Sequence, residues 1–412
     1  MLRKVGQHRW IILVIITLIV TLLVPGLSFA KQPSTAKQQP ATKQPPTPKP
    51  QTKIEADYAS AILMDDETGQ ILFEKDAHKK VIPASLVKMM VLLLAMEKLE
   101  TGAIHLSDSV TTSAWASKIG GQQIYLKEGE TFTLEEFLKA MAISSANDAA
   151  TAVAEFLAGD TEACVHMMNS RAKELGMHET TFANVHGLPP DKGQEENVTS
   201  AYDLAILGRT LLKHPQILSW TAMLEDTIRN GTFTLTNTNR EFLRRYSGAD
   251  GLKTGFHPRG ADFCVCATAK RQDRRLVAVV MGAAQKRDRY RAVIDLLNLG
   301  FNQFEKVVVV RKGFPMGNPI PIQNGKQRET TLVAADNAVV LVEKGQEKSI
   351  KQDVKLAVQE ITAPVKQGTK FGEVVISVGD QPIKQVDLVI EEDIAKGSFV
   401  DRFKRWLGDK VS

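Results

Sequence analysis

The chain has 412 residues, of which 43% are hydrophobic and 24% charged, with 52 basic and 47 acidic side chains and a net charge of +5. This balance is that of an ordinary globular protein, not of a disordered chain or one with many membrane spans. The basic residues are spread along the chain without forming a basic stripe, so the composition indicates no nucleic-acid partner. At this length we expect two domains plus tails, since domains cluster near ~100–200 residues.

Residues 1–30 have the pattern of a signal peptide. Three basic residues within the first nine positions precede an apolar run from Trp10 to Val24, and the small residues Ser28 and Ala30 fit the positions before a cleavage bond. An uncleaved anchor is the alternative, and either one exports the rest of the chain. Residues 31–54 are rich in Pro, Gln and Lys, which predicts an extended linker that cannot bury enough surface to fold.

Residues 55–303 alternate between strand and helix patterns. Two apolar runs between Tyr58 and Phe73 flank a Gly-containing turn, which predicts a hairpin. The segment from Ser85 to Leu99 is apolar on nearly every side, so we expect a buried helix. Two more strands (Phe263–Ala269 and Leu276–Met281) and an amphipathic helix (Arg289–Phe301) follow.

A helical region is predicted in the middle of this domain. Thr133-x-x-Glu136 is a capping box that opens one helix, and the side chains of Asn147 and Asp148 are suitable caps for the next. Together with the strands, these helices predict an α/β (α+β) domain in which a helical cluster lies beside a sheet.

Residues 304–395 have a different sequence pattern, in which short Val- and Ile-rich runs are separated by Gly, Pro and Asn. The runs are Val307–Val310, Ala338–Val342, Val354–Val358 and Val374–Val378. We therefore expect a separate, small all-β sandwich domain. In residues 396–412 large apolar and basic residues alternate at helical spacing, which predicts an amphipathic tail that lies on a membrane surface, with packing against the β domain as the alternative.

The three cysteines, Cys164, Cys264 and Cys266, form no C-x-x-C pair and no Cys/His cluster with zinc-ligand spacing. Cys264 and Cys266 would lie on the same face of one strand, a poor geometry for a disulfide between them. We interpret all three as small buried apolar residues. The sequence indicates no metal site and no cofactor.

The segment Ser85-Leu86-Val87-Lys88 places a hydroxyl and an amine on one face of the predicted buried helix. A lysine in apolar surroundings loses part of its preference for charge, so a neutral Lys88 could accept the proton of Ser85. The S-x-x-K pattern alone is weak evidence, because it also occurs at Ser28, Ser34 and Ser170. Only Ser85 stands on a long buried helix.

Two companion motifs follow in order, Ser145-Ala146-Asn147 and Lys253-Thr254-Gly255. Singly, these residues could be helix caps or surface charges, but the three motifs together are typical of penicillin-binding proteins. From about residue 56 to 304 the chain resembles the serine-type D-alanyl-D-alanine carboxypeptidases among the low-molecular-mass penicillin-binding proteins. The resemblance implies a β-lactamase/transpeptidase-like catalytic domain, followed by the β domain typical of the group.

The resemblance also implies a role for each residue. Ser85 attacks the carbonyl that joins two terminal D-alanines, Lys88 is the base, and Ser145 passes a proton to the leaving amine. Asn147 binds the substrate amide, Lys253 and Thr254 bind the terminal carboxylate, and Lys253 keeps Lys88 neutral by repulsion. The backbone N–H groups of Ser85 and Phe256 form the oxyanion hole, Gly255 permits the close approach, and Arg289 lies near the carboxylate. His186 is interpreted as structural.

The expected partners are peptidoglycan stem peptides as substrate, β-lactam antibiotics as covalent inhibitors, and a membrane surface. The expected location is the outer face of the cytoplasmic membrane or the cell wall or periplasmic space. His257 follows Phe256 where relatives more often have Thr, and no counterpart of the deacylating glutamate of class A β-lactamases is evident. The alternatives are a muropeptide endopeptidase or a β-lactamase on the same scaffold, or a catalytically silent wall-binding protein.

Overall fold

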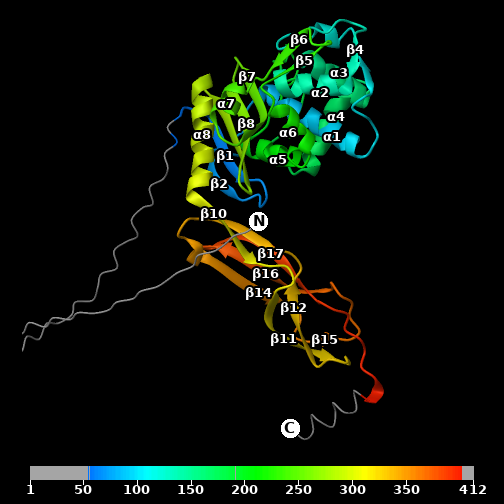
Figure 1. Cartoon of the computed structure of the whole chain (residues 1–412), viewed down its shortest axis with the longest axis vertical. Helices are drawn as coiled ribbons and strands as arrows, with labels where there is room; N and C mark the ends of the chain where they lie inside the picture. The colour runs from blue at the N-terminus through cyan, green and yellow to red at the C-terminus, as the bar shows by residue number, and fades with distance from the viewer. Residues whose placement is uncertain (1–53, 55, 191, 401–412) are drawn as a thin grey trace, which may run out of the picture. The chain divides into compact units, whose positions relative to one another are not determined.

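The computed structural model describes residues 54, 56–190 and 192–400 (Figure 1). The predicted signal peptide, almost all of the predicted linker and residues 401–412 of the predicted tail lie outside the described residues.

A five-stranded antiparallel sheet organises the first part of the described chain. Its strands, in the spatial order β2-β1-β9-β8-β7, are β1 (Ser60–Asp65), β2 (Ile71–Lys75), β7 (Ala249–His257), β8 (Asp262–Arg271) and β9 (Arg274–Ala283). The predicted hairpin is confirmed as β1 and β2, whose turn is closed by Asp65 Oδ1 accepting from the backbone N–H of Thr68 at 2.8 Å. The two later predicted strands are confirmed as β8 and β9.

Alternate side chains of the sheet enter two separate cores because successive residues of a strand point to opposite faces. On one face lie Ala61, Leu63, Val265, Ala267 and Val280, against the helix α8 (Lys286–Gln303). On the other lie Ile62, Met64, Cys264, Cys266 and Val279, against α5 (Ala201–Leu211) and the helical cluster. Figure 1 shows α8 on the first face and α5 and α6 on the second.

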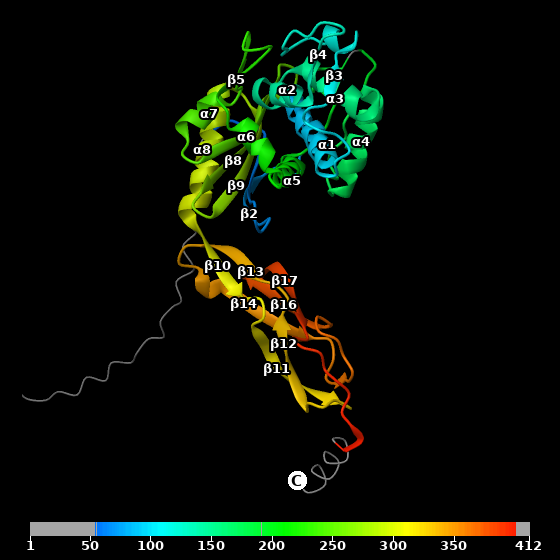
Figure 2. The ribbon, with the colours of Figure 1, turned by 45° about the vertical axis from the view of Figure 1, so that its right-hand side comes forward.

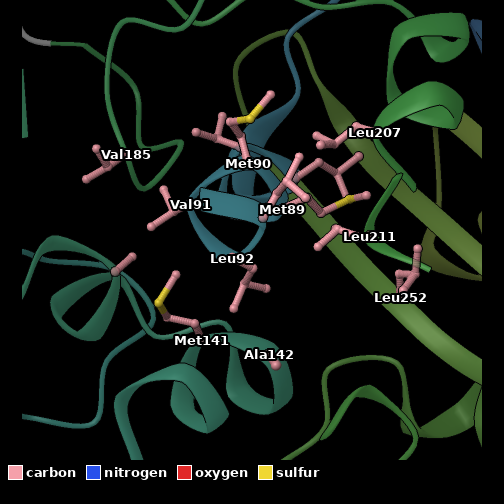
Figure 3. Close-up of a cluster of buried hydrophobic side chains, with 14 of the residues drawn as sticks. Met89, Met90, Val91, Leu92, Met141, Ala142, Val185, Leu207, Leu211 and Leu252 are labelled. Atoms are coloured by element: carbon pink, nitrogen blue, oxygen red, sulfur yellow. The ribbon is translucent and has the colours of Figure 1, made fainter. Parts of the chain in front are cut away.

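The helical cluster is built around α1 (Lys88–Glu100), whose first nine residues are all buried. Met89, Met90, Val91 and Leu92 point outward in different directions and meet side chains from α5, the sheet and the segment near Met141 (Figure 3). The other elements are η2 (Ala116–Lys118), α2 (Leu134–Lys139), η3 (Ala140–Ser144), α3 (Asn147–Ala158), α4 (Thr161–Glu174), α6 (Pro215–Thr221), α7 (Arg240–Arg245) and the hairpins β3 (Ser109–Thr111) with β4 (Thr131–Thr133) and β5 (Glu225–Ile228) with β6 (Phe233–Thr236).

Two local expectations are corrected. The helix predicted from Ser85 begins as a 3₁₀ turn, η1 (Ala84–Val87), and becomes α-helical only at Lys88. The prediction that Asn147 and Asp148 cap α3 is wrong, because the N-cap is Ala146 and no side chain caps the helix. Asp148 instead accepts from the N–H groups of Ile124 and Leu126, both at 3.1 Å, which fixes an adjoining loop.

The capping box predicted at the start of α2 is confirmed. Thr133 Oγ1 accepts from the N–H of Glu136 at 3.3 Å, and Glu136 Oε2 accepts from the N–H of Thr133 at 3.1 Å. Both partners of this motif are local, so the sequence determines the contact without help from distant segments.

The second part of the described chain is all β. A two-stranded sheet, β10 (Phe304–Val310) with β13 (Ala338–Glu343), shares one core with a six-stranded sheet. The six strands, in spatial order, are β14 (Ile350–Leu356), β16 (Lys370–Val378), β17 (Gln381–Val389), β12 (Glu329–Ala334), β11 (Pro315–Gln323) and β15 (Ile361–Thr362) (Figure 2). Three of the four predicted runs fall inside strands, and the run at Val354–Val358 extends two residues beyond the end of β14. No helix among the described residues is long and apolar enough to span a membrane.

Candidate active site

Ser85 and Lys88 meet at the junction of η1 and α1. Lys88 is fully buried, and its Nζ lies 3.0 Å from Oγ of Ser85 and donates to the carbonyl oxygen of His186 at 2.6 Å. Burial lowers the pKa of Lys88 well below its usual value, and the nearby charge of Lys253 lowers it further. A neutral amine at this place can accept the proton of the serine hydroxyl.

Lys253 reaches the same site from β7. Its Nζ donates to Oγ of Ser145 at 2.6 Å and to the carbonyl oxygen of Thr254 at 3.0 Å. Burial, followed by the charge of Arg289, lowers the pKa of Lys253 to about 7. Ser145 directly follows η3 and has a φ of +65°, a left-handed conformation that is uncommon for a serine and recurs at functional sites.

At the start of α3, the nitrogen and the oxygen of the Asn147 side-chain amide differ in their hydrogen bonding. Its Nδ2 donates to the carbonyl oxygen of Gly120 at 2.8 Å, while its buried Oδ1 has no hydrogen-bond partner among the described residues. A buried acceptor without a donor is costly, so this oxygen is suited to an amide N–H brought by a ligand.

The edge of β7 brings Thr254, Gly255 and Phe256 to the site. A Cβ on Gly255 would lie 2.8 Å from the carbonyl oxygen of Pro83, so only glycine allows the strand to approach η1 this closely. The ring of Phe256 is half exposed and tilted against Phe263. Oγ1 of Thr254 donates to Oγ1 of Thr238 at 2.8 Å.

Arg289, in the first turn of α8, is buried beneath this edge. Its guanidinium donates to the carbonyl oxygen of Cys264 at 3.2 Å and to the hydroxyl of Tyr290 at 2.8 Å, while its Nε has no partner among the described residues. The predicted cation is therefore next to the site, where it adds positive potential beneath Thr254.

Most of the predicted site residues line one cavity of about 450 Å³. The predicted residues that line it are Ser85, Ser145, Asn147, Thr254, Gly255, Phe256 and Arg289. Lys88 and Lys253 do not line it, because they are buried behind Ser85 and Ser145 and reach those hydroxyls by hydrogen bonds. The arrangement presents two hydroxyls to the cavity, each backed by an amine of lowered pKa.

Three contributors to the site were not predicted from the sequence. Thr238 lines the cavity and holds Thr254, and nothing in the sequence near Thr238 indicates this. The backbone carbonyl of His186 holds Lys88, a role that no residue type signals because every residue has a carbonyl group. The ring of His186 accepts from the N–H of Leu188 at 3.1 Å and has its pKa lowered to about 4, chiefly by burial.

His257 is the third missed residue, although its departure from the pattern of relatives was visible. It lines the cavity and is 2% exposed, with Nδ1 accepting from the N–H of Arg259 at 3.0 Å. Its Nε2 lies 3.7 Å from Oε2 of Glu196. The buried imidazole thus forms part of the cavity wall, with its Nε2 next to a carboxylate.

The expectations for the cysteines agree with the structure. Cys164, Cys264 and Cys266 are free and buried, and burial raises the pKa of each thiol to about 12. No group of three or more His, Cys, Asp or Glu side chains within the described residues could hold a metal ion.

Comparison with known proteins identifies the family. The family model for D-alanyl-D-alanine carboxypeptidases matches residues 42–285. The chain belongs to this family. A second model, the C-terminal domain of penicillin-binding protein 5, matches residues 304–396, in agreement with the all-β part of the structure. The resemblance and the fold class predicted from the motifs are confirmed.

Individual relatives of this carboxypeptidase extend over most of the chain. D-alanyl-D-alanine carboxypeptidase DacF of Bacillus subtilis is 37% identical over 354 residues, covering 85% of this chain and 89% of the relative. Penicillin-binding protein 5 of Haemophilus influenzae is 26% identical with a TM-score of 0.74, covering 83% of this chain and 98% of its own. Penicillin-binding protein D2 of Listeria monocytogenes, solved in an ampicillin-bound form, is 29% identical with a TM-score of 0.56 and covers 61% of this chain and 100% of its own.

Proposed function

We propose that this chain is a serine D-Ala-D-Ala carboxypeptidase that removes the terminal D-alanine of peptidoglycan stem peptides through an acyl-enzyme on Ser85. The observation that carries the proposal is the 3.0 Å approach of Lys88 Nζ to Ser85 Oγ, made by an amine whose pKa burial has lowered. Such an amine supplies the general base that a serine nucleophile needs.

In the acylation step Ser85 Oγ attacks the carbonyl carbon of the D-Ala-D-Ala bond while its proton passes to Lys88 Nζ. The backbone N–H groups of Ser85 and Phe256 hold the negative charge of the tetrahedral intermediate. The intermediate collapses when the C–N bond breaks. Ser145, hydrogen-bonded to Lys253 at 2.6 Å, gives its proton to the leaving amine and takes up the proton that Lys88 received, which leaves Lys88 neutral again. Free D-alanine leaves, and the ester on Ser85 remains.

The rest of the site binds the substrate ends. Thr254, with the positive potential of Lys253 and Arg289 beneath it, receives the terminal carboxylate, and Oδ1 of Asn147 accepts the amide N–H of the substrate. Water then hydrolyses the ester and regenerates Ser85. A β-lactam carries an amide and a carboxylate at similar places, so it acylates the same serine, and slow hydrolysis of that ester makes it an inhibitor.

The proposal extends to the organisation of the whole chain. We take residues 1–30 to be a signal peptide, 31–54 a linker, 55–303 the catalytic domain, 304–395 a β-sandwich domain and 396–412 a membrane-associating tail. This order places the enzyme at the outer face of the cytoplasmic membrane, next to its polymeric substrate.

The test of the function is release of D-alanine from a peptide that ends in D-Ala-D-Ala, with the D-Ala-L-Ala peptide as the stereochemical control. We expect release from the first peptide only, and none from either by Ser85→Ala. Cleavage of a cross-bridge between two stems without release from the terminal pair would instead identify an endopeptidase. Binding of wall fragments by a folded chain with no turnover would identify a catalytically silent protein.

A further inference from the structure

A second groove, of about 670 Å³, lies beside the candidate active site. It runs between the first turns of α4, the segment that carries Trp115 and Ile119, and the turn at residues 181–190. Leu188 and Pro189 line both this groove and the active-site cavity. A single extended ligand can therefore lie in the active site and continue over Leu188 and Pro189 into the groove.

The two cavities differ in charge. The active-site cavity is lined by Lys286 and Arg289, with Lys253 buried behind it. The second groove is lined by the carboxylates of Glu162 and Glu195, and no Lys or Arg among the described residues lines it. Both glutamates are exposed, and within the described part of the chain neither forms an ion pair.

An exposed aromatic ring adds to this negative potential. Trp115 is 59% exposed at the rim of the groove, although tryptophan is usually well buried. The face of an indole attracts a cation, and the attraction is stronger for Trp than for the other aromatic side chains. The positive end of α4 amounts to roughly half a charge, which the two full negative charges outweigh. The groove thus combines the two groups that recognise an ammonium ion.

We propose that this groove binds the protonated side-chain amine of a stem-peptide residue that precedes the D-Ala-D-Ala pair. The inference rests on the proposed function, because the carboxylate end of the same peptide lies in the active-site cavity. An extended peptide spans at most about 3.3–3.6 Å per residue, so three residues and a long side chain cover on the order of 15 Å. The enzyme then recognises two opposite charges on its substrate, the terminal carboxylate and the side-chain amine.

The experiment compares two substrates with the full chain. One is Nα-acetyl-lysyl-D-alanyl-D-alanine with a free side-chain amine, and the other is the same peptide with that amine acetylated. We expect kcat/KM for D-alanine release to be about tenfold higher for the free amine, since an exposed ion pair and a cation–π contact each contribute a few-fold. The preference should weaken as salt is added, because the carboxylates are exposed to solvent.

Variants locate the source of the preference. Glu162→Gln combined with Glu195→Gln is expected to bring the two substrates to nearly equal kcat/KM, and Trp115→Ala to reduce the preference by a few-fold. Turnover of the acetylated peptide by each variant is the reference for this comparison, because that peptide carries no side-chain charge. Glu74→Gln, which removes an exposed carboxylate on β2 away from both cavities, is the matched control and should keep the full preference.

Several outcomes would overturn the inference. Equal kcat/KM for the two peptides in the unaltered chain would show that the groove does not bind the amine. A preference for the free amine that survives in the double variant would show the same. Competition by a peptide-free glycan fragment that depends on Trp115 and not on the glutamates would assign the groove to sugar. No turnover of either peptide by a chain that still reacts with penicillin would contradict the carboxypeptidase function itself, and the inference would fall with it.

Discussion

At the scale of single residues, burial lowers the pKa of both lysines of the site. Lys88 and Lys253 are both buried, and desolvation is the largest cause of the lowered pKa of each. Lys88 also experiences the charge of Lys253, whereas Lys253 experiences that of Arg289. The like charges form a series in which the charge of Arg289 acts on Lys253 and the charge of Lys253 acts on Lys88, the proposed base.

Replacement of the base tests its role. Lys88→Met keeps most of the buried volume but has no group to accept the proton of Ser85, so acylation by a fluorescent penicillin should slow by roughly 10²–10⁴-fold. The chain offers a matched control in the chance motif of Ser170 and Lys173 on α4, where Lys173 is exposed. Lys173→Met should acylate at the unaltered rate, and equal rates in the two variants would exclude Lys88 as the base.

The two lysines also predict a bell-shaped pH dependence of kcat/KM. Activity should rise with pH as Lys88 loses its proton, and fall above about pH 7 as Lys253, whose pKa is lowered to about 7, loses the charge that attracts the substrate carboxylate. Lys253→Arg keeps a cation at alkaline pH. We therefore expect kcat/KM of this variant to stay high above pH 7 and still to decrease at acid pH. If kcat/KM of the variant decreases above pH 7 as in the unaltered chain, that decrease belongs to another group.

At the scale of elements, the turn from Asn184 to Leu188 connects the helical cluster to Lys88, the proposed base. Asn184 Oδ1 accepts from the N–H of Gly187 at 2.7 Å and of His186 at 3.3 Å, which points the carbonyl group of His186 at Lys88. Gly187 has a φ of +79°, and a Cβ there would overlap the carbonyl group of Ala84 next to Ser85. The turn fits only because this residue is glycine.

A pair of glycine substitutions separates backbone strain from this contact. Gly187→Ala should destabilise the fold by about 1–3 kcal/mol and reduce penicillin acylation at least tenfold, because η1 must move. Gly193→Ala has a similar φ of +92° in the same connection but nothing within 4 Å of its added Cβ. It should lose about 1 kcal/mol in thermal or denaturant unfolding and acylate normally. Normal acylation by folded Gly187→Ala would show that the turn does not position the site.

What the sequence could predict at this scale depends on how local each contact is. The hairpin of β1 and β2 and the capping box at Thr133 involve partners within a few residues, so their patterns are sufficient. The 3₁₀ start at Ala84–Val87 depends on the distant Gly187 and Gly255, and the carboxylate of Asp148 binds a loop more than twenty residues away. Those contacts require the tertiary fold, which no local pattern contains.

The same distinction applies to the candidate site. Three motifs predicted which residues meet, and the structure brings them together at or just behind one cavity. Thr238, His257 and the carbonyl group of His186 could not be predicted. Their role in the site depends on where the folded chain places them and not on their residue type.

At the scale of the whole molecule, we propose that the predicted tail holds the enzyme at a membrane. Only its first residues are described, and there Phe399 and Val400 are 75% and 58% exposed. If the signal peptide is cleaved, deletion from Gly397 onward should move the protein from the membrane pellet to the supernatant, since the deleted segment holds the alternating apolar and basic residues. Unchanged sedimentation of the truncated, processed protein would contradict membrane attachment through the tail.

Ser85 is the proposed nucleophile of the carboxypeptidase, and every step of the proposed reaction depends on it. The most direct measurement is to react the full chain with penicillin, digest it, and find by mass spectrometry which peptide carries the added mass. We predict one adduct, on the Ser85 hydroxyl, that is absent in Ser85→Ala and slow to form in Lys88→Met. An adduct on another residue such as Ser145 or Ser170, or one that persists in folded Ser85→Ala, would contradict it.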